Sequence, residues 1–418
     1  MSVALNEYKH GASLFIADTA AVGLEMPVIY DPHVPIYNKG LPVTTITGSP
    51  GHGKTMAGQI ICAHAALLGK TVAAIDYKGD LLKLYSLKEE LGVPIKLWNI
   101  ADRKRAGMLD PFVMTSKPSE QLALALDLIS LFLGGLDRTD RADLSPLIKD
   151  VAEGDSPSMM KVLQKLKSSA KSSVQGIGEE LDVIRQQSYA HICFNPSVKR
   201  RAQKESLVDG GLTIATLAGM DLPQDADEAQ RSVGGRLASG ILFLLTDYVR
   251  RLMFAASDRP KLFVIDEAWS VLSTDAGRQI VKEVSLLGRS KSLATVLITQ
   301  RPDHITEAKI DNTIGCRFAF KGDKRDAKTL AEDMDLPEGY EEMISTTLPK
   351  YYCLMQDWDG RFGVIKFSSW RPDWMEAFST DPYALMEKKK NAKLAADRKK
   401  AADEAKMAKY RARTLASQ

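Results

Sequence analysis

The chain has 418 residues, of which 44% are hydrophobic and 26% are charged, a balance typical of a soluble globular protein with a sizeable core. Its formal net charge of +3 conceals a strongly basic stretch, because residues 387–413 carry eleven lysines and arginines against four acidic residues. No run approaches the ~20 apolar residues that a membrane span needs, and the four scattered cysteines form no CxxC pair, which argues against a zinc site or a disulfide framework.

The N-terminal segment, residues 1–40, is a mixed stretch that ends in a proline-rich loop. Residues Glu7, Lys9 and His10 interrupt any apolar run, so no secretory signal is expected at the start of the chain. We therefore expect a cytoplasmic protein, which can still dock on a membrane complex.

Short runs rich in valine, isoleucine and phenylalanine recur along the chain after this segment, and most are followed by a turn and a helical pattern. This alternation is the signature of βα units and of a parallel sheet. The expected buried strands are Val43–Thr47, Thr71–Ile75, Ile95–Trp98, Leu212–Leu217, Leu262–Ile265, Thr295–Ile298 and Arg317–Phe320. The sequence therefore predicts an α/β fold with a mainly parallel sheet.

The first of these strands leads into a phosphate-binding motif. Residues 48–55 read GSPGHGKT, which fits G-x-x-x-x-G-K-[ST] between a β-branched run and a helical run, the context that separates a P-loop from a chance glycine turn. Lys54 is expected between the β- and γ-phosphates of ATP, and Thr55 is expected to hold Mg²⁺ at the helix N-terminus. The expected nucleotide contacts are Gly48, Ser49, Pro50, Gly51, His52, Gly53, Lys54, Thr55 and Met56.

The region that follows the third strand breaks the βα alternation. Residues 118–188 show a helical pattern with little strand signal, and apolar residues recur at positions 122, 126, 129 and 133. We expect an all-α insert at residues 115–195, which divides the α/β core into residues 41–114 and 196–375.

The second half of the nucleotide site is expected directly after the strand 262–265. Four apolar residues put Asp266 at the carboxyl end of a buried strand, where ligands bind in open α/β sheets. Asp266 is expected to hold the hydrated Mg²⁺ ion, and Glu267 to orient and deprotonate the attacking water. The alternative is an Asp-Glu pair that only caps the next helix.

Two more residues are candidates for the hydrolytic step. Gln300 follows the strand that ends at Ile298, where it can contact the γ-phosphate and report its loss, unless it only makes a turn. In GTPases, an arginine supplied to the nucleotide by a neighbouring protein increases the rate of hydrolysis by roughly 10³–10⁵-fold. Arg289 is our candidate for this arginine, with Arg317 and Arg325 as rivals.

The chain closes with an expected hairpin and a basic tail. Tyr351–Met355 and Phe362–Phe367 flank an Asp-Trp-Asp-Gly turn, which predicts an antiparallel hairpin at the sheet edge. Residues 376–418 are rich in alanine and charged residues and predict a basic helix or a disordered arm. This tail either binds nucleic-acid phosphates or an acidic partner protein, or it only keeps the protein soluble.

These motifs together resemble those of the HerA/FtsK superfamily of P-loop ATPases, and within it the TraC-type (VirB-type) ATPases of conjugation and type IV secretion. The segments that carry the resemblance are spread over most of the chain. Residues 76–80 (DYKGD) resemble the family's DPKGD segment, residues 109–112 (LDPF) its NPF motif, residues 266–269 (DEAW) its Walker B motif, and residues 288–290 (GRS) and 299–302 (TQRP) its later motifs.

The resemblance implies a RecA-like motor domain that hydrolyses ATP with Mg²⁺ and works as a homo-oligomer, typically a hexameric ring. It further implies a membrane-bound secretion complex as partner, at the inner face of the membrane, and DNA as a second candidate partner. The nucleotide-site residues Lys54, Thr55, Asp266, Glu267 and Gln300 carry over directly, and Arg289 carries over as the arginine that acts between subunits. The expected function is a motor that energises transfer of DNA or protein in a conjugation or type IV secretion-like system.

The chain departs from the family pattern in a few places. TraC-type proteins have a large N-terminal domain, whereas about forty residues precede the P-loop here, which leaves room for a stand-alone DNA-pumping translocase in packaging or segregation. His52 is unusual inside a P-loop, and Asp110 replaces the family's asparagine. A nucleotide-gated scaffold with little turnover is a third reading, against which the intact Glu267 argues.

Overall fold

The computed structural model describes residues 14–19, 27–194, 205–220, 226–256 and 258–367, together with residues 374, 377 and 378. Residues 1–370 form one compact unit and residues 371–418 a second. The fold described below belongs to the first unit. The predicted basic tail, residues 376–418, lies outside the described residues apart from Ala377 and Phe378.

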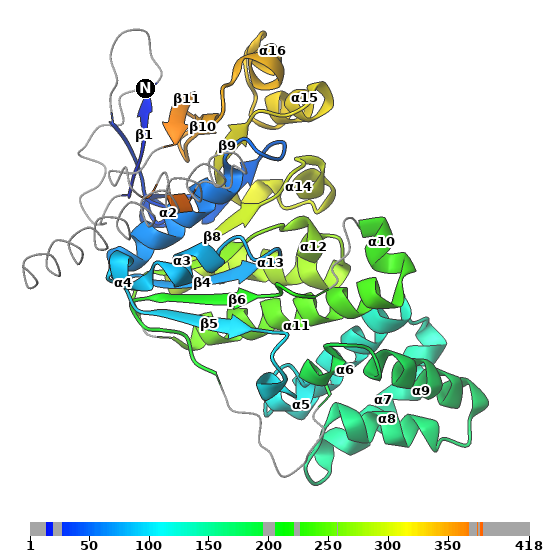
Figure 1. Cartoon of the computed structure of the whole chain (residues 1–418). Helices are drawn as coiled ribbons and strands as arrows, with labels where there is room; N and C mark the ends of the chain where they lie inside the picture. Colours follow the sequence, from blue (N-terminus) through cyan, green and yellow to red (C-terminus); the bar gives the residue numbers. More distant parts are fainter. Residues whose placement is uncertain are drawn as a thin grey trace, which may run out of the picture. The chain divides into compact units, whose positions relative to one another are not determined.

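One sheet of eleven strands organises the first unit, in the order β2-β1-β11-β10-β9-β3-β8-β7-β4-β6-β5 (Figure 1). The seven strands from β9 to β5 run parallel to one another. They are β3 (Val43–Thr47), β4 (Thr71–Asp76), β5 (Ile95–Asn99), β6 (Leu212–Thr216), β7 (Lys261–Ile265), β8 (Leu293–Ile298) and β9 (Ile314–Phe320). These strands correspond one to one to the seven expected from the sequence, so the predicted α/β fold with a mainly parallel sheet is confirmed.

The parallel strands lie in the interior, because helices cover both faces of the sheet. Every residue of β3, β4, β6, β7 and β8 is buried, as expected for parallel strands that read as continuous apolar runs. Helix α2 (Lys54–Leu67) packs on β4, β7 and β8, while α11 (Val233–Ala255) and α13 (Asp275–Gly288) pack on β4 and β8 respectively.

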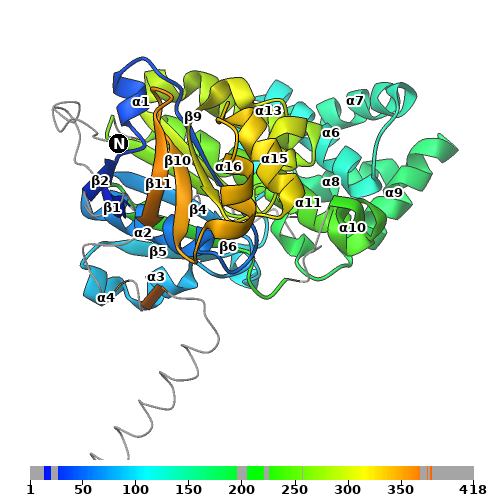
Figure 2. The same cartoon turned by 90° about the horizontal axis from the view of Figure 1, so that it is seen from above.

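An antiparallel extension completes the sheet beyond β9. Strands β10 (Tyr352–Gln356) and β11 (Phe362–Phe367) form the predicted hairpin. The prediction that this hairpin lies at the sheet edge is wrong, because β1 (Leu14–Thr19) pairs with β11 and β2 (Pro27–Tyr30) pairs with β1. Figure 2 shows these four strands side by side. The N-terminal segment thus supplies the two outermost strands on this side of the sheet.

Buried polar contacts fix the chain after β2 against the amino ends of the parallel strands. The Asp31 carboxylate accepts a hydrogen bond from Lys70 Nζ at 2.6 Å, and His33 Nε2 donates to the Lys261 carbonyl at 2.9 Å. Helix α1 (Val34–Tyr37) follows directly. Because both contacts are buried, they hold this part of the N-terminal segment firmly on the core.

Helices replace strands between β5 and β6, as expected from the sequence. The described part of this stretch, up to residue 194, contains five α-helices: α5 (Pro111–Met114), α6 (Pro118–Leu133), α7 (Arg138–Glu153), α8 (Met159–Lys167) and α9 (Ser172–Arg185). They gather beside α11 (Figures 1 and 2). Proline at the start of α6 and Gly134 in the left-handed conformation at its end explain the bounds of that helix.

The contact between α6 and α11 is close, because glycine stands where the two helices approach. A Cβ atom at Gly240 would lie 2.4 Å from the ring of Phe132, which is fully buried. One continuous hydrophobic core runs from the sheet through this contact into the helices. The division into a core (41–114 and 196–375) and an insert (115–195) stays a prediction.

The remaining helices are short and flank the strand ends. They are α3 (Leu82–Ser86), α4 (Lys88–Leu91), α10 (Ala226–Arg231), α12 (Trp269–Leu272), α14 (Asp303–Glu307), α15 (Lys324–Asp333) and α16 (Tyr340–Glu342). Among the helices that the structure describes, none combines the length and the apolar character that crossing a bilayer requires.

Candidate functional site

The loop between β3 and α2 has the curled backbone of a phosphate cradle. Gly48, Gly51 and Gly53 have φ angles of 139°, 81° and 115°, in the region that glycine adopts without steric cost. A Cβ atom at Gly48 would also lie 2.9 Å from the Phe320 carbonyl oxygen. The loop therefore needs glycine for its shape, and a glycine-rich turn of this kind is able to direct backbone N–H groups at a bound anion.

Lys54 and its two neighbours begin helix α2. The Lys54 side chain is buried, and its Nζ donates to the Ser49 carbonyl at 3.0 Å, inside the loop. Burial lowers the pKa of Lys54 to about 8, against the opposing effect of nearby Glu267 and Asp266. Thr55 is half-buried, and the Met56 side chain is buried, which leaves the Met56 backbone N–H as its contribution to a nucleotide.

Four neighbouring parallel strands bring the expected site residues to one edge of the sheet. The strand order β3-β8-β7-β4 differs from the chain order, and all four run in the same direction. The P-loop follows β3, Gln300 follows β8, Asp266 and Glu267 follow β7, and residues 77–80 follow β4. Because the carboxyl ends of parallel strands share one edge, the cradle faces the acidic pair.

Asp266 is a buried carboxylate with an unsatisfied oxygen. Burial raises the pKa of Asp266 well above its usual range, and the negative charges of Glu267 and Asp76 add to the effect. Its Oδ1 accepts a hydrogen bond from the Glu267 backbone N–H at 3.1 Å, whereas Oδ2 has no hydrogen-bond partner among the described residues. A buried carboxyl oxygen without a partner fits a hydrated Mg²⁺ ion, for which Thr55 is the second ligand expected from the sequence.

Three donors from three strand ends hold the Glu267 side chain. Oε1 accepts from Lys78 Nζ at 2.5 Å and from Gln300 Nε2 at 2.9 Å, while Oε2 accepts from the Trp269 indole at 3.0 Å. Glu267 itself has a φ of 52°, a strained value for a residue other than glycine. Strained backbone concentrates at functional sites, so the conformation is consistent with the role expected for this carboxylate.

Two of these donors, Lys78 and Trp269, received no role in the sequence analysis. Both stand in motifs that carry the family resemblance, but the sequence does not show that β4 lies next to β7. The signal available was position alone, since Lys78 follows the predicted strand Thr71–Ile75 by three residues, close to the spacing of two between Ile298 and Gln300.

The candidate arginines occupy different places. Arg289 precedes β8 and its guanidinium donates to the Lys39 carbonyl at 3.4 Å, so it lies at the amino ends of the parallel strands, opposite to the P-loop. Arg317 lies within β9 and pairs with Asp333 at 2.7 Å. Arg325 is exposed on α15, after the end of β9. The structure thus does not bring Arg289 to the nucleotide site of its own chain.

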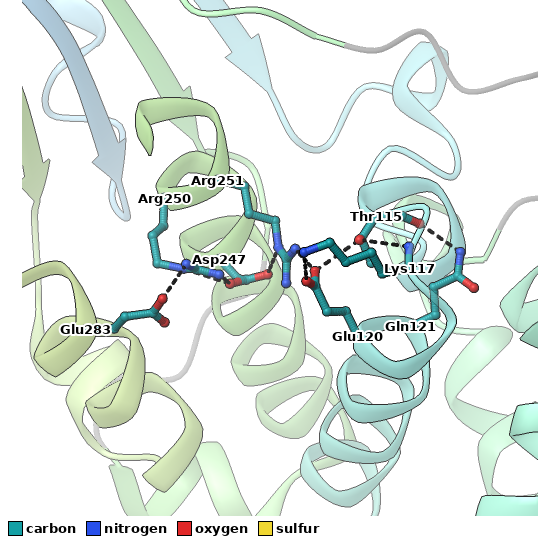
Figure 3. Close-up of polar contacts among 8 residues, drawn as sticks. All are labelled: Thr115, Lys117, Glu120, Gln121, Asp247, Arg250, Arg251 and Glu283. Atoms are coloured by element: carbon teal, nitrogen blue, oxygen red, sulfur yellow. Dashed lines mark hydrogen bonds and ion pairs between the residues drawn. The ribbon is translucent and has the colours of Figure 1, made fainter. Parts of the chain in front are cut away.

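A polar network connects α6 to α13, the helix that leads towards β8 and Gln300 (Figure 3). The buried Asp247 on α11 accepts from Arg250 Nε at 2.9 Å and from Arg251 Nε at 2.6 Å. Arg250 also donates to Glu283 on α13 at 2.9 Å, and Arg251 pairs with Glu120 on α6. The hydrogen bond from Arg251 is the main cause that lowers the pKa of Glu120 to about 2.

Comparison with known proteins gives a family match over most of the chain. The family described as AAA-like domain matches residues 38–378. The uncharacterised protein YddE of Bacillus subtilis (strain 168) is 23% identical over 361 residues, which cover 81% of this chain and 43% of YddE. The chain therefore spans less than half the length of this relative.

Solved structures match the fold. VirB4 of Thermoanaerobacter pseudethanolicus superposes with a TM-score of 0.68 at 14% identity, over 87% of this chain and 98% of that one. The plasmid coupling protein TrwB in complex with a non-hydrolysable ATP analogue superposes with a TM-score of 0.55 at 14% identity, over 86% and 94% of the two chains. Since the family match covers well over half of the sequence, the chain belongs to the AAA-like domain family, and its fold is that of VirB4 and TrwB, as the resemblance predicted.

Proposed function

We propose that this protein is a Mg²⁺-dependent ATPase whose hydrolysis drives a transport motor. The observation that carries the proposal is the convergence of Lys54, Asp266, Glu267 and Gln300 at the carboxyl ends of neighbouring parallel strands. Phosphoryl transfer to water needs three parts, all of which are present here. They are a cradle for phosphates, a buried carboxylate with an unsatisfied oxygen, and a second carboxylate held by neutral and cationic donors.

On this proposal each of these residues has a role. The backbone of residues 48–56 binds the phosphates, and the Lys54 ammonium neutralises charge on the β- and γ-phosphates. Thr55 and Asp266 hold Mg²⁺, which when bound offsets the charge that develops on the phosphates. Glu267 accepts a proton from water as the water oxygen bonds to the γ-phosphorus and the bond to the ADP oxygen breaks. Gln300 donates to Glu267 and fixes its direction.

The work that hydrolysis drives is the transfer of DNA or protein in a conjugation or type IV secretion-like system. Support comes from the fold likeness to VirB4 and to the plasmid coupling protein TrwB. On this proposal the chain assembles as a homo-oligomer, a hexamer in the family pattern, and docks at the inner face of the membrane on a secretion complex. Arg289 then acts across the subunit interface, because the nucleotide site of the same chain lies at the opposite edge of the sheet.

A stand-alone DNA pump and a nucleotide-gated scaffold are the two alternatives. Duplex DNA separates the first from the secretion motor: hydrolysis that DNA stimulates, with stimulation that falls as salt rises, favours the pump because salt weakens phosphate contacts. Hydrolysis that DNA leaves unchanged favours a motor that needs its protein partners.

The Glu267→Gln variant tests the ATPase assignment. Glutamine keeps the size and two polar atoms of the side chain but cannot accept the proton, so we expect phosphate release to fall by roughly 10²–10⁴-fold. ATP affinity should stay close to that of the wild type, because Lys54 and the P-loop are intact. Unchanged phosphate release in Glu267→Gln would contradict the assignment and favour the scaffold.

A further inference from the structure

Lys78 makes a direct contact with the proposed catalytic base. It follows β4 by two residues, and its ammonium lies 2.5 Å from Glu267 Oε1. The Lys78 side chain is 43% exposed, whereas that of Glu267 is 10% exposed. The ion pair therefore joins a carboxylate fixed in the interior to a lysine that reaches it from the water side.

The contact leaves Glu267 Oε1 without a free lone pair for a water molecule. Oε1 already accepts from Lys78 and Gln300, and Oε2 accepts from Trp269. A general base needs a free lone pair that points at the water it deprotonates. The Lys78 ammonium and the Gln300 amide together occupy both lone pairs of Oε1. Gln300 and Trp269 are neutral and only orient the carboxylate.

We propose that Lys78 is a nucleotide-dependent latch on Glu267, a positioning residue that binds the carboxylate in the nucleotide-free chain and moves to the γ-phosphate when ATP binds. The move frees Glu267 Oε1 for the attacking water. ADP has no γ-phosphate and leaves the latch on Glu267. This inference rests on the proposed ATPase function, and it adds a step that couples the presence of the γ-phosphate to the release of the base.

The charges around the site support the move. Lys78 is near enough to Lys54 that its charge contributes to the lowered pKa of Lys54, after the larger effect of burial. Both ammonium groups thus approach the same region, where the terminal phosphate of ATP would lie beside Lys54. That phosphate carries more negative charge than a single carboxylate, so it competes effectively for an exposed lysine.

The loop that carries Lys78 does not depend on the ion pair for its shape. The Asp76 carboxylate accepts from the Gly79 backbone N–H at 2.9 Å, and Gln59 Nε2 donates to the Asp80 carbonyl at 2.7 Å. These contacts hold both ends of the loop. A substitution of Lys78 should therefore leave the fold intact and change only the state of Glu267.

The test compares Lys78→Met with Lys78→Arg, which keeps a cation at the position. The fluorescence of Trp269 reports on the state of Glu267, because the Trp269 indole donates a hydrogen bond to that carboxylate. Subtracting the emission of a Trp269→Phe variant removes the contribution of the other four tryptophans. In the wild type, a non-hydrolysable ATP analogue with Mg²⁺ should change this emission, and ADP with Mg²⁺ should not. In Lys78→Met the analogue and ADP should give the same emission.

Nucleotide affinity gives the second readout. Loss of one charge-assisted contact to the γ-phosphate should lower the preference for the ATP analogue over ADP by about tenfold in Lys78→Met, and Lys78→Arg should keep most of it. The proposal is overturned if Lys78→Met retains both the wild-type emission difference and the wild-type affinity ratio. Failure of the ATPase assignment is separate, since it would appear as normal phosphate release in Glu267→Gln.

Discussion

The buried Lys54 ammonium predicts that ATP binding takes up a proton at alkaline pH. Burial lowers its pKa from 10.5 to about 8 in the nucleotide-free chain, and phosphates placed against it should return the pKa towards its usual value. From the value of about 8, roughly three quarters of the molecules carry the proton at about pH 7.5, and only about 3% do so at about pH 9.5. ATP affinity should therefore fall by about 25-fold, or about 2 kcal/mol, across this interval.

Isothermal titration calorimetry in buffers of different ionisation enthalpy measures both the affinity and the protons taken up. We expect uptake of about a quarter of a proton at about pH 7.5 and nearly one at about pH 9.5. The neighbouring His52 does not interfere, because burial lowers its pKa from 6.5, away from this window. The Lys54→Arg variant is the matched control, since its guanidinium stays protonated throughout. Proton uptake that is equal at the two pH values, or that persists in Lys54→Arg, would refute the reasoning.

Burial of the Lys54 ammonium also lowers the free energy of unfolding of the nucleotide-free protein. Its folded pKa lies below its unfolded value, so the unfolded chain binds more protons between about pH 8 and 10.5 and stability rises with pH through that window. A shift from 10.5 to about 8 corresponds to about 3 kcal/mol. Lys54→Met should therefore raise the free energy of unfolding at neutral pH by up to about this amount, while it abolishes tight ATP binding. Equal denaturant midpoints for Lys54→Met and wild type would contradict this.

Three further predictions concern parts of the chain outside the phosphate cradle. Gly240→Ala should destabilise the protein by about 1–3 kcal/mol, because its Cβ would lie 2.4 Å from the Phe132 ring; denaturant unfolding measures the loss, and wild-type stability would show that α6 and α11 can separate without cost. If Arg289 acts between subunits, a mixture of the inactive Arg289→Ala and Glu267→Gln variants should regain ATPase activity. Some interfaces in the mixed oligomers then combine an intact base from one subunit with an intact arginine from the other. If mixed oligomers form and no activity returns, Arg289 does not have that role. Removal of the residues after 382 should weaken binding to duplex DNA or to an acidic partner if the tail grips either, and unchanged affinity assigns it to solubility alone.

Local patterns in the sequence were sufficient for the seven parallel strands, for the hairpin and for the individual motifs. The P-loop and the Asp266-Glu267 pair could be predicted because each follows a short apolar run directly, and the residue type that chemistry needs stands at the strand end. The strand order could not be predicted, because long-range packing decides it. The contacts of Lys78 and Trp269 with Glu267 depend on β4 lying beside β7, and no periodicity carries that information.

Two other differences have simpler causes. Strands β1 and β2 were missed because a mixed N-terminal stretch with polar interruptions lacks a clean alternation, and pairing with β11 decides its conformation. The position of Arg289 was in fact available from its place in the chain. A residue that precedes a parallel strand lies at the amino edge of the sheet, and the P-loop lies at the carboxyl edge. Arg289 therefore reaches a nucleotide only if that nucleotide belongs to another subunit.

A chain of contacts links Glu267, at the candidate nucleotide site, to Asp247 on α11. Gln300, bonded to Glu267, stands at the carboxyl end of β8, and α13 enters β8 from its other end. Glu283 on α13 is held by Arg250, which shares the buried Asp247 with Arg251 and so connects to Glu120 on α6. Asp247 and Arg250 are the buried members of this network, so loss of either one should leave the other charge buried and unpaired. Arg250 also holds Glu283, so we expect α11 and α13 to move as one body.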